Sequence, residues 1–147
     1  MVEYLNKLLA NFVVMQYKVH SIHTDIVGTL FWDVHLLLNE VYKFFGDDNI
    51  DVIKERVRVL KNFTTSNLCD LIDLSEIEEI SKVPSMVRSL EVVFADLETI
   101  EKCLNEGKDL CTENKDLDTQ QILIDFSLAV GTLRRKVESI LAKSTLV

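Results

Sequence analysis

The sequence contains very few of the residues that interrupt regular structure. It has one proline and four glycines in 147 residues. Chains built from many short strands need frequent turns, and turns draw heavily on these two residue types. Their scarcity therefore favours a few long helices. With 48% apolar and 27% charged residues, the chain is expected to form one globular domain over residues 1–147.

Cysteine pairs and an excess of positive charge are also missing. The three cysteines are widely spaced and include no Cys-x-x-Cys pair, so neither a zinc ribbon nor a disulfide framework is indicated. The net charge is −8, and an acidic surface repels nucleic-acid phosphate. We therefore do not expect the body of the protein to bind DNA.

No apolar run reaches the length that crosses a membrane. Glu3 and Lys7 flank the first apolar segment and Asn11 interrupts it, so we expect no signal peptide. These features predict a cytoplasmic protein without a membrane partner.

The apolar residues recur at helical spacing in long segments. The first is residues 2–27, and the second runs from about 30 to 60 with an interruption at 46–49, as one long helix with a local break or as two consecutive helices. A short helix fits residues 71–80. Pro84 suits the first turn of the next helix, which continues to about Asn105 and is closed by Gly107.

A polar connection is predicted at residues 108–117. Asp118 and Gln121 resemble a capping box for a last helix, which runs from about Thr119 to Ala142. These segments together predict an all-α fold, an antiparallel four-helix bundle with a short extra helix in its long central connection.

Four residues form the strongest candidate site: His23, His35, Asp51 and Glu55. The chain has only three histidines, and these two are twelve residues apart. The two acids are four apart and so share a helix face. Imidazoles and carboxylates together suit iron or another first-row metal. Each group also has a simpler interpretation, because the acids fit a solvated helix face and the histidines fit hydrogen-bonded residues of an apolar stripe.

The familiar helical metal motifs are absent from the sequence. No glutamate lies three residues before any histidine, which excludes the Glu-x-x-His pattern of di-iron bundles. His-Glu-x-x-His is missing too, which excludes the corresponding zinc proteases. We therefore do not expect a di-iron site of that type within one bundle.

The chain resembles the Dps family, the miniferritins, over nearly its whole length. The resemblance is carried by Lys18-Val19-His20-Ser21-Ile22-His23, by Phe31-Trp32-Asp33-Val34-His35 and by the Asp-x-x-x-Glu-Arg pattern of residues 51–56. Its most specific element is the pair of histidines twelve apart, followed by that acidic pattern.

The resemblance implies a ferritin-like bundle and a ferroxidase centre shared between two subunits. His23 and His35 of one subunit would face Asp51 and Glu55 of its two-fold mate. Such a protein oxidises Fe²⁺, typically with hydrogen peroxide, and stores the ferric mineral inside a hollow dodecamer built from dimers. Other divalent metals such as Zn²⁺ can substitute for iron at such a centre.

Three departures from the family pattern leave a second function open. Thr24 stands where an aromatic residue usually follows the first histidine, and Asn39 stands where an acid often follows the second. The acid pair also falls one residue later than usual, which predicts an inserted residue within 46–50. The alternative is a Dps-like cage or binding protein with weakened or lost ferroxidase activity.

Overall fold

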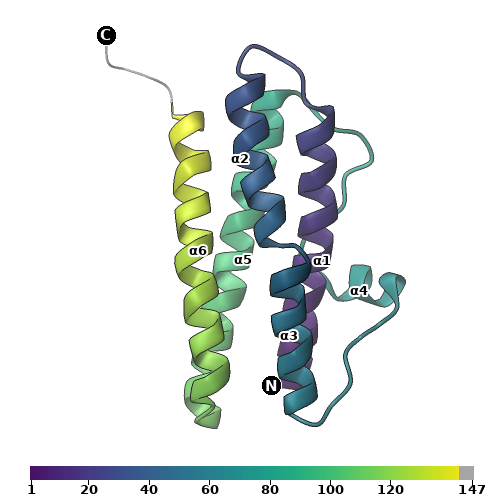
Figure 1. Ribbon diagram of the computed structural model, residues 1–147, viewed down its shortest axis with the longest axis vertical. Helices are drawn as coiled ribbons and strands as arrows, with labels where there is room; N and C mark the ends of the chain where they lie inside the picture. Colours follow the sequence, from purple (N-terminus) through teal and green to yellow (C-terminus); the bar gives the residue numbers. More distant parts are fainter. Residues whose placement is uncertain (143–147) are drawn as a thin grey trace.

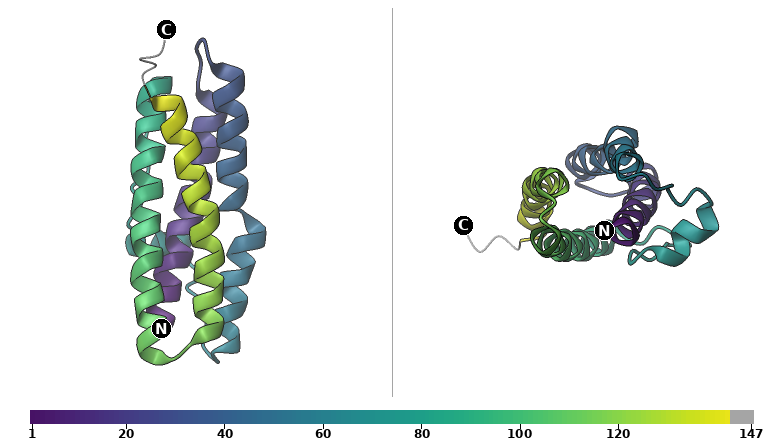
Figure 2. Two further views of the ribbon diagram at one scale, coloured as in Figure 1. Left: turned by 90° about the vertical axis from the view of Figure 1, so that its left-hand side faces the viewer. Right: turned by 90° about the horizontal axis from the view of Figure 1, so that it is seen from below.

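Six helices account for the regular structure of residues 1–142, which are the residues that the computed structural model describes. Helices α1, α5 and α6 form the bundle together with α2 and α3, which are stacked end to end and take the place of its fourth helix. Helix α4 lies outside the bundle (Figures 1 and 2). The all-α fold and the short extra helix of the central connection are thus confirmed. The helices are α1 Val2–Asp25, α2 Phe31–Phe44, α3 Asp47–Val59, α4 Leu68–Leu74, α5 Met86–Asn114 and α6 Leu117–Leu141.

An aromatic cluster holds the middle of the bundle together. Phe12 of α1 is fully buried, and its ring centroid lies 4.9 Å from that of Phe45 and 5.1 Å from that of Phe126. Phe44 adds a fourth ring, whose centroid lies 5.9 Å from that of Phe12. These contacts join α1, the end of α2 and α6. Tilted and edge-on aromatic pairs at such spacings stabilise a core beyond the apolar area that they bury.

The predicted helical segment from about 30 to 60 is broken at Gly46. This favours its interpretation as two consecutive helices, α2 and α3. Gly46 is the N-cap of α3, and the Asn49 side-chain amide donates a hydrogen bond of 2.6 Å to the Phe44 carbonyl left free by the break. Asp47 and Asp48 then occupy the first turn of α3, where negative charge favours the helix dipole. The break lies where the sequence predicted an inserted residue.

The prediction that Gly107 closes the fifth helix is wrong. Helix α5 continues through Gly107 to its last residue, Asn114, and the C-cap that follows, Lys115, has a left-handed backbone with φ of 56°. Gly107 is buried instead, and a Cβ atom there would overlap the ring of Tyr4 on α1. This glycine allows two helices to approach closely, so the predicted polar connection at 108–117 shrinks to a tight turn.

The predicted capping box at Asp118 is also wrong. The N-cap of α6 is Asp116, whose Oδ1 accepts a hydrogen bond of 3.0 Å from the Thr119 backbone N–H. Gln121 donates to Asp125 one turn further on rather than reaching back. Because Asp116 lies two residues before Asp118, α6 begins earlier than predicted, at Leu117.

The central connection also differs from its prediction. The short helix is α4, which ends at Leu74, and residues 75–80 are not helical. Asn11 of α1 explains the early end, since its buried Oδ1 accepts hydrogen bonds from the Ser75 hydroxyl and from the Glu76 N–H. Pro84 lies just before the Ser85 N-cap of α5, not in the first helical turn.

Candidate metal centre

The structure brings His23 and His35 together at one end of the bundle. His23 lies in the last turn of α1 and His35 in the second turn of the antiparallel α2, so a short loop places them side by side. Their rings stack with centroids 3.8 Å apart and planes 22° from parallel. The spacing of twelve residues in the sequence thus becomes direct contact.

His35 is held in an orientation that suits a metal ligand. Its Nδ1 lies 2.9 Å from the carbonyl oxygen of His23. A carbonyl can only accept, so Nδ1 donates this hydrogen bond and Nε2 is the nitrogen left for a metal. Phe31 stacks on the other face of the ring at 4.8 Å, and Trp32 meets it edge-on at 6.1 Å. A hydrogen bond from one ring nitrogen to a carbonyl is the usual way in which a protein orients a metal-binding histidine.

His23 has a lowered pKa and a ring nitrogen without a hydrogen-bond partner in residues 1–142. Burial lowers the pKa of His23, and the neighbouring His35, His20 and Lys43 lower it further. Its Nδ1 is buried and has no hydrogen-bond partner within the described chain. Neutral imidazole is the form that binds metals, and a buried nitrogen without a partner is costly. A bound ion or ordered water beside this ring would relieve that cost.

Asp51 and Glu55 lie on α3, away from the two imidazoles of the same chain. Both carboxylates are exposed and are one helical turn apart. Asp51 follows His35 by sixteen residues along α2 and α3, which run in the same direction on both sides of the break (Figure 1). At the rise of an α-helix, these sixteen residues separate Asp51 from His35 by roughly 20–25 Å. Within residues 1–142, no three His, Cys, Asp or Glu side chains gather as one chain's metal site. One chain therefore presents the two halves of the predicted site separately.

Arg56 fixes the direction in which these carboxylates point. Its Nε donates 2.8 Å to the Thr119 hydroxyl and its Nη2 lies 2.9 Å from Asp116 Oδ1, which ties α3 to the start of α6. Burial opposes ionisation of Asp116, but hydrogen bonds from Thr119 and the charge of Arg56 outweigh it, so the pKa of Asp116 lies below its usual range. Because Arg56 faces inward, its neighbour Glu55 faces outward.

Replacing Arg56 by Ala is expected to lower the free energy of unfolding by about 2–3 kcal/mol, because a mostly buried carboxylate loses its charged donor. Urea denaturation measures the loss. Arg58→Ala is the control on the same helix, since Arg58 is exposed and its contacts are local, namely a 2.7 Å hydrogen bond to the Asn62 carbonyl and a cation–π interaction with Phe63. Equal losses in both variants would show that the Arg56 contacts do not anchor α3.

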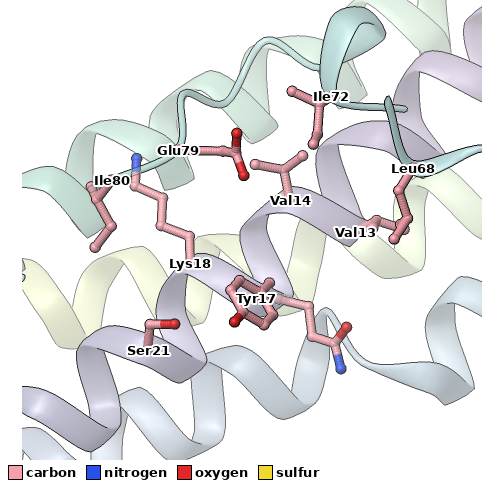
Figure 3. A pocket seen from close by; sticks show the side chains of 10 residues that line it. Val13, Val14, Tyr17, Lys18, Ser21, Leu68, Ile72, Glu79 and Ile80 are labelled. Carbon is pink, nitrogen blue, oxygen red and sulfur yellow. The ribbon is translucent and has the colours of Figure 1, made fainter. Parts of the chain in front are cut away.

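A separate pocket opens on the outside of the bundle, between α1, α4 and the segment that follows α4 (Figure 3). None of the four candidate ligands lines it. At its edge, the buried Lys18 forms an ion pair of 2.7 Å with Asp96 of α5. Its largely apolar wall suits contact with another protein surface better than metal binding. The lining is Val13, Val14, Gln16, Tyr17, Lys18, Ser21, Leu68, Ile72, Glu79 and Ile80.

Comparison with known proteins identifies the family. A family model for the ferritin-like domain matches residues 2–145. Antigen TpF1 of Treponema pallidum is 30% identical over 130 residues, which cover 88% of this chain and 73% of the antigen. The DNA protection during starvation protein of Listeria monocytogenes is 27% identical and covers 87% of this chain and 83% of that protein. The chain belongs to the Dps family of ferritin-like proteins.

Solved structures of Dps proteins have the same fold. The crystal structure of antigen TpF1 matches with a TM-score of 0.91 and 26% identity, covering 97% of this chain and 91% of that chain. Dps from Listeria monocytogenes matches with a TM-score of 0.90 and 26% identity, covering 97% of this chain and 94% of that chain.

In residues 1–142 of this Dps chain, no helix has the length and apolar character needed to cross a membrane.

Proposed function

We propose that this Dps chain oxidises ferrous iron with hydrogen peroxide and stores the ferric product as mineral inside a twelve-subunit cage. The observation that carries the proposal is the His23–His35 pair, in which a backbone carbonyl orients one ring and the other has a buried nitrogen without a partner. The oxygen ligands would be Asp51 and Glu55 of the two-fold mate. We propose that residues 1–147 form a single domain, which contains this half of the site.

The spacing of the imidazoles suits two iron ions. The two rings are nearly parallel and 3.8 Å apart, which is close to the distance of about 3.5–4 Å that typically separates the ions of a two-metal site. Glu55 could bridge two such ions through its two oxygens, while Asp51 binds one of them. Each Fe²⁺ gives one electron to peroxide, the O–O bond breaks, and two protons complete two water molecules.

The exposed acids of α3 need a second chain to complete the centre. Apolar side chains on the neighbouring surface support such a contact: Tyr17 is 74% exposed, Leu68 is 65% exposed, and both line the pocket beside α4. A two-fold contact through this region would repeat in a dodecamer built from dimers. Light scattering is expected to give the mass of the dodecamer, and a stable monomer would remove both the cage and the shared site.

Other divalent metals are proposed to bind the same ligands. Imidazole and carboxylate donors together accept several first-row ions. The structural neighbours include Dps from Listeria innocua soaked with zinc and with cobalt, at 25% and 26% identity to this chain. Zn²⁺ and Co²⁺ are therefore suitable probes of the proposed centre.

DNA binding is not part of the proposal, although relatives carry the name DNA protection during starvation. The net charge of −8 disfavours contact with phosphate and favours the attraction of cations. We propose that the protein works in the cytoplasm by removing iron and peroxide. A gel shift that persists at moderate salt would contradict this assignment.

Asn39 and Thr24 favour the second candidate function, a cage with weak or lost oxidation. The amide of Asn39 is a poorer ligand for a highly charged ion than the carboxylate that often occupies this position in the family. The same substitutions leave His23 and His35 in place. Metal binding without peroxide-dependent oxidation would identify this alternative.

Replacing His35 by Ala is expected to slow peroxide-dependent oxidation of Fe²⁺ by at least about tenfold, since even outer-shell partners of metal ligands act on that scale. Absorbance of the ferric product after anaerobic loading with Fe²⁺ measures the rate. Asp33→Asn is the control, because Asp33 is exposed on the same helix two residues away. Equal slow rates in the wild type and in His35→Ala would end the catalytic proposal.

A further inference from the structure

The third histidine of the chain, His20, lies one helical turn before His23 on α1. Its side chain is exposed, and the ring centroids of the two histidines are 5.9 Å apart with planes at 47°. Tyr42 of α2 stacks on His20 with centroids 4.4 Å apart and meets His23 edge-on at 5.0 Å. One tyrosine thus contacts both imidazoles and holds them at a defined spacing.

This spacing fits two imidazoles that bind the same ion. Metal–nitrogen bonds are about 2.0–2.1 Å long and the nitrogen lies roughly 1 Å from the ring centre, so two rings on one ion have centroids about 4.5–6 Å apart. The His20–His23 pair, at 5.9 Å, falls within this range. The His23–His35 pair, stacked at 3.8 Å, suits two neighbouring ions instead. His23 therefore has a second imidazole at co-ligand distance on its own helix.

The charge of this surface gives a third imidazole a role. Asn39 lies on α2 between His35 and Tyr42, at helical spacing from both, and is neutral. The half of the centre that this chain supplies would otherwise consist of two imidazoles only. An additional nitrogen ligand raises affinity without requiring a carboxylate, and the neighbouring His23 has a buried Nδ1 without a hydrogen-bond partner in the described chain.

We infer that His20 is a third imidazole ligand, which shares one divalent ion with His23 and gives this half of the centre a nitrogen-rich ligand set. The inference rests on the proposed function, because the oxygen ligands come from the two-fold mate. Imidazole suits Zn²⁺, Co²⁺, Ni²⁺ and Cu²⁺, whereas Mn²⁺ and Mg²⁺ favour oxygen. His20 thus sets which metals the centre accepts in addition to iron.

The test uses Co²⁺ as the probe, because its visible absorption reports the number and type of ligands. His20→Phe keeps an aromatic ring against Tyr42 but removes both nitrogens, and His20→Gln removes the imidazole without adding a bulky ring. Ser21→Ala is the neighbouring control on α1. The full-length protein is titrated with Co²⁺ and, separately, with Mn²⁺, and bound metal is counted by equilibrium dialysis. Light scattering and circular dichroism verify the assembly and the fold of each variant.

Both His20 variants are expected to lose at least about tenfold in affinity for one Co²⁺ per site, with a weaker absorption band, and much less in affinity for Mn²⁺. Ser21→Ala should match the wild type. Wild-type affinity and absorption in His20→Phe and His20→Gln, with lost binding in His35→Ala, would overturn the role of His20 and leave the proposed function standing. Equal Co²⁺ binding by the wild type and His35→Ala would overturn both the proposed function and the role of His20 that rests on it.

Discussion

Replacing Asp51 by Asn and Glu55 by Gln together is expected to abolish rapid oxidation of Fe²⁺ by peroxide. The double variant removes every carboxylate of the proposed centre while preserving the size of both side chains. We expect a fall in rate of at least about 100-fold, beyond the effect of losing one outer-shell partner. Stopped-flow absorbance of the ferric product measures it. Both side chains are exposed, so the fold and its thermal stability should be retained.

The matched control for this variant is Asp47→Asn with Asp48→Asn. It removes the same charge from the first turn of the same helix, where both acids are exposed and neither is a proposed ligand. Its oxidation rate should stay near that of the wild type, with a small loss of helix stability. A similar fall in both double variants would mean that general surface charge, not ligation by Asp51 and Glu55, governs the reaction.

Replacing Gly107 by Ala is expected to lower the free energy of unfolding by about 3 kcal/mol, at the upper end of the usual cost of overpacking. The new methyl group would overlap Tyr4, whose ring is confined because its hydroxyl donates 2.9 Å to the Cys103 carbonyl within the core. Either the tyrosine or helix α5 must move. Urea denaturation at fixed protein concentration measures the change.

Gly131→Ala provides the contrast, because a Cβ atom at Gly131 of α6 meets nothing within 4 Å. Alanine is the better helix former by about 1 kcal/mol, so this variant should be unchanged or more stable. The double variant Tyr4→Leu with Gly107→Ala should recover part of the loss. A Gly107→Ala protein as stable as the wild type would contradict the close approach of α1 and α5.

The fold could be predicted because long apolar stripes are a local property of the sequence. The same periodicity placed His23 near the end of one helix and His35 near the start of the next. A tight connection at Gly28 then brought the two imidazoles together. Periodicity could not predict the role of Gly107, because a glycine that ends a helix cannot be told from sequence apart from one that makes room for a neighbouring ring.

Contacts between distant residues account for the other errors. The early end of α4 depends on Asn11, which lies more than sixty residues away in the sequence and accepts hydrogen bonds from the turn after the helix. The start of α6 depends on Asp116, which Arg56 of α3 also holds. The stacking of His20 on Tyr42 likewise joins two helices that no local pattern relates.

The most direct test of the shared centre is complementation between two inactive variants. One chain carries His23→Ala with His35→Ala, the other carries Asp51→Asn with Glu55→Gln, and the two are produced together so that they pair at random. Each mixed dimer then has one intact centre of two, so about a quarter of wild-type oxidation is expected. Each variant alone should be inactive. A mixture as inactive as its components would contradict the assignment of imidazole and carboxylate ligands to opposite subunits.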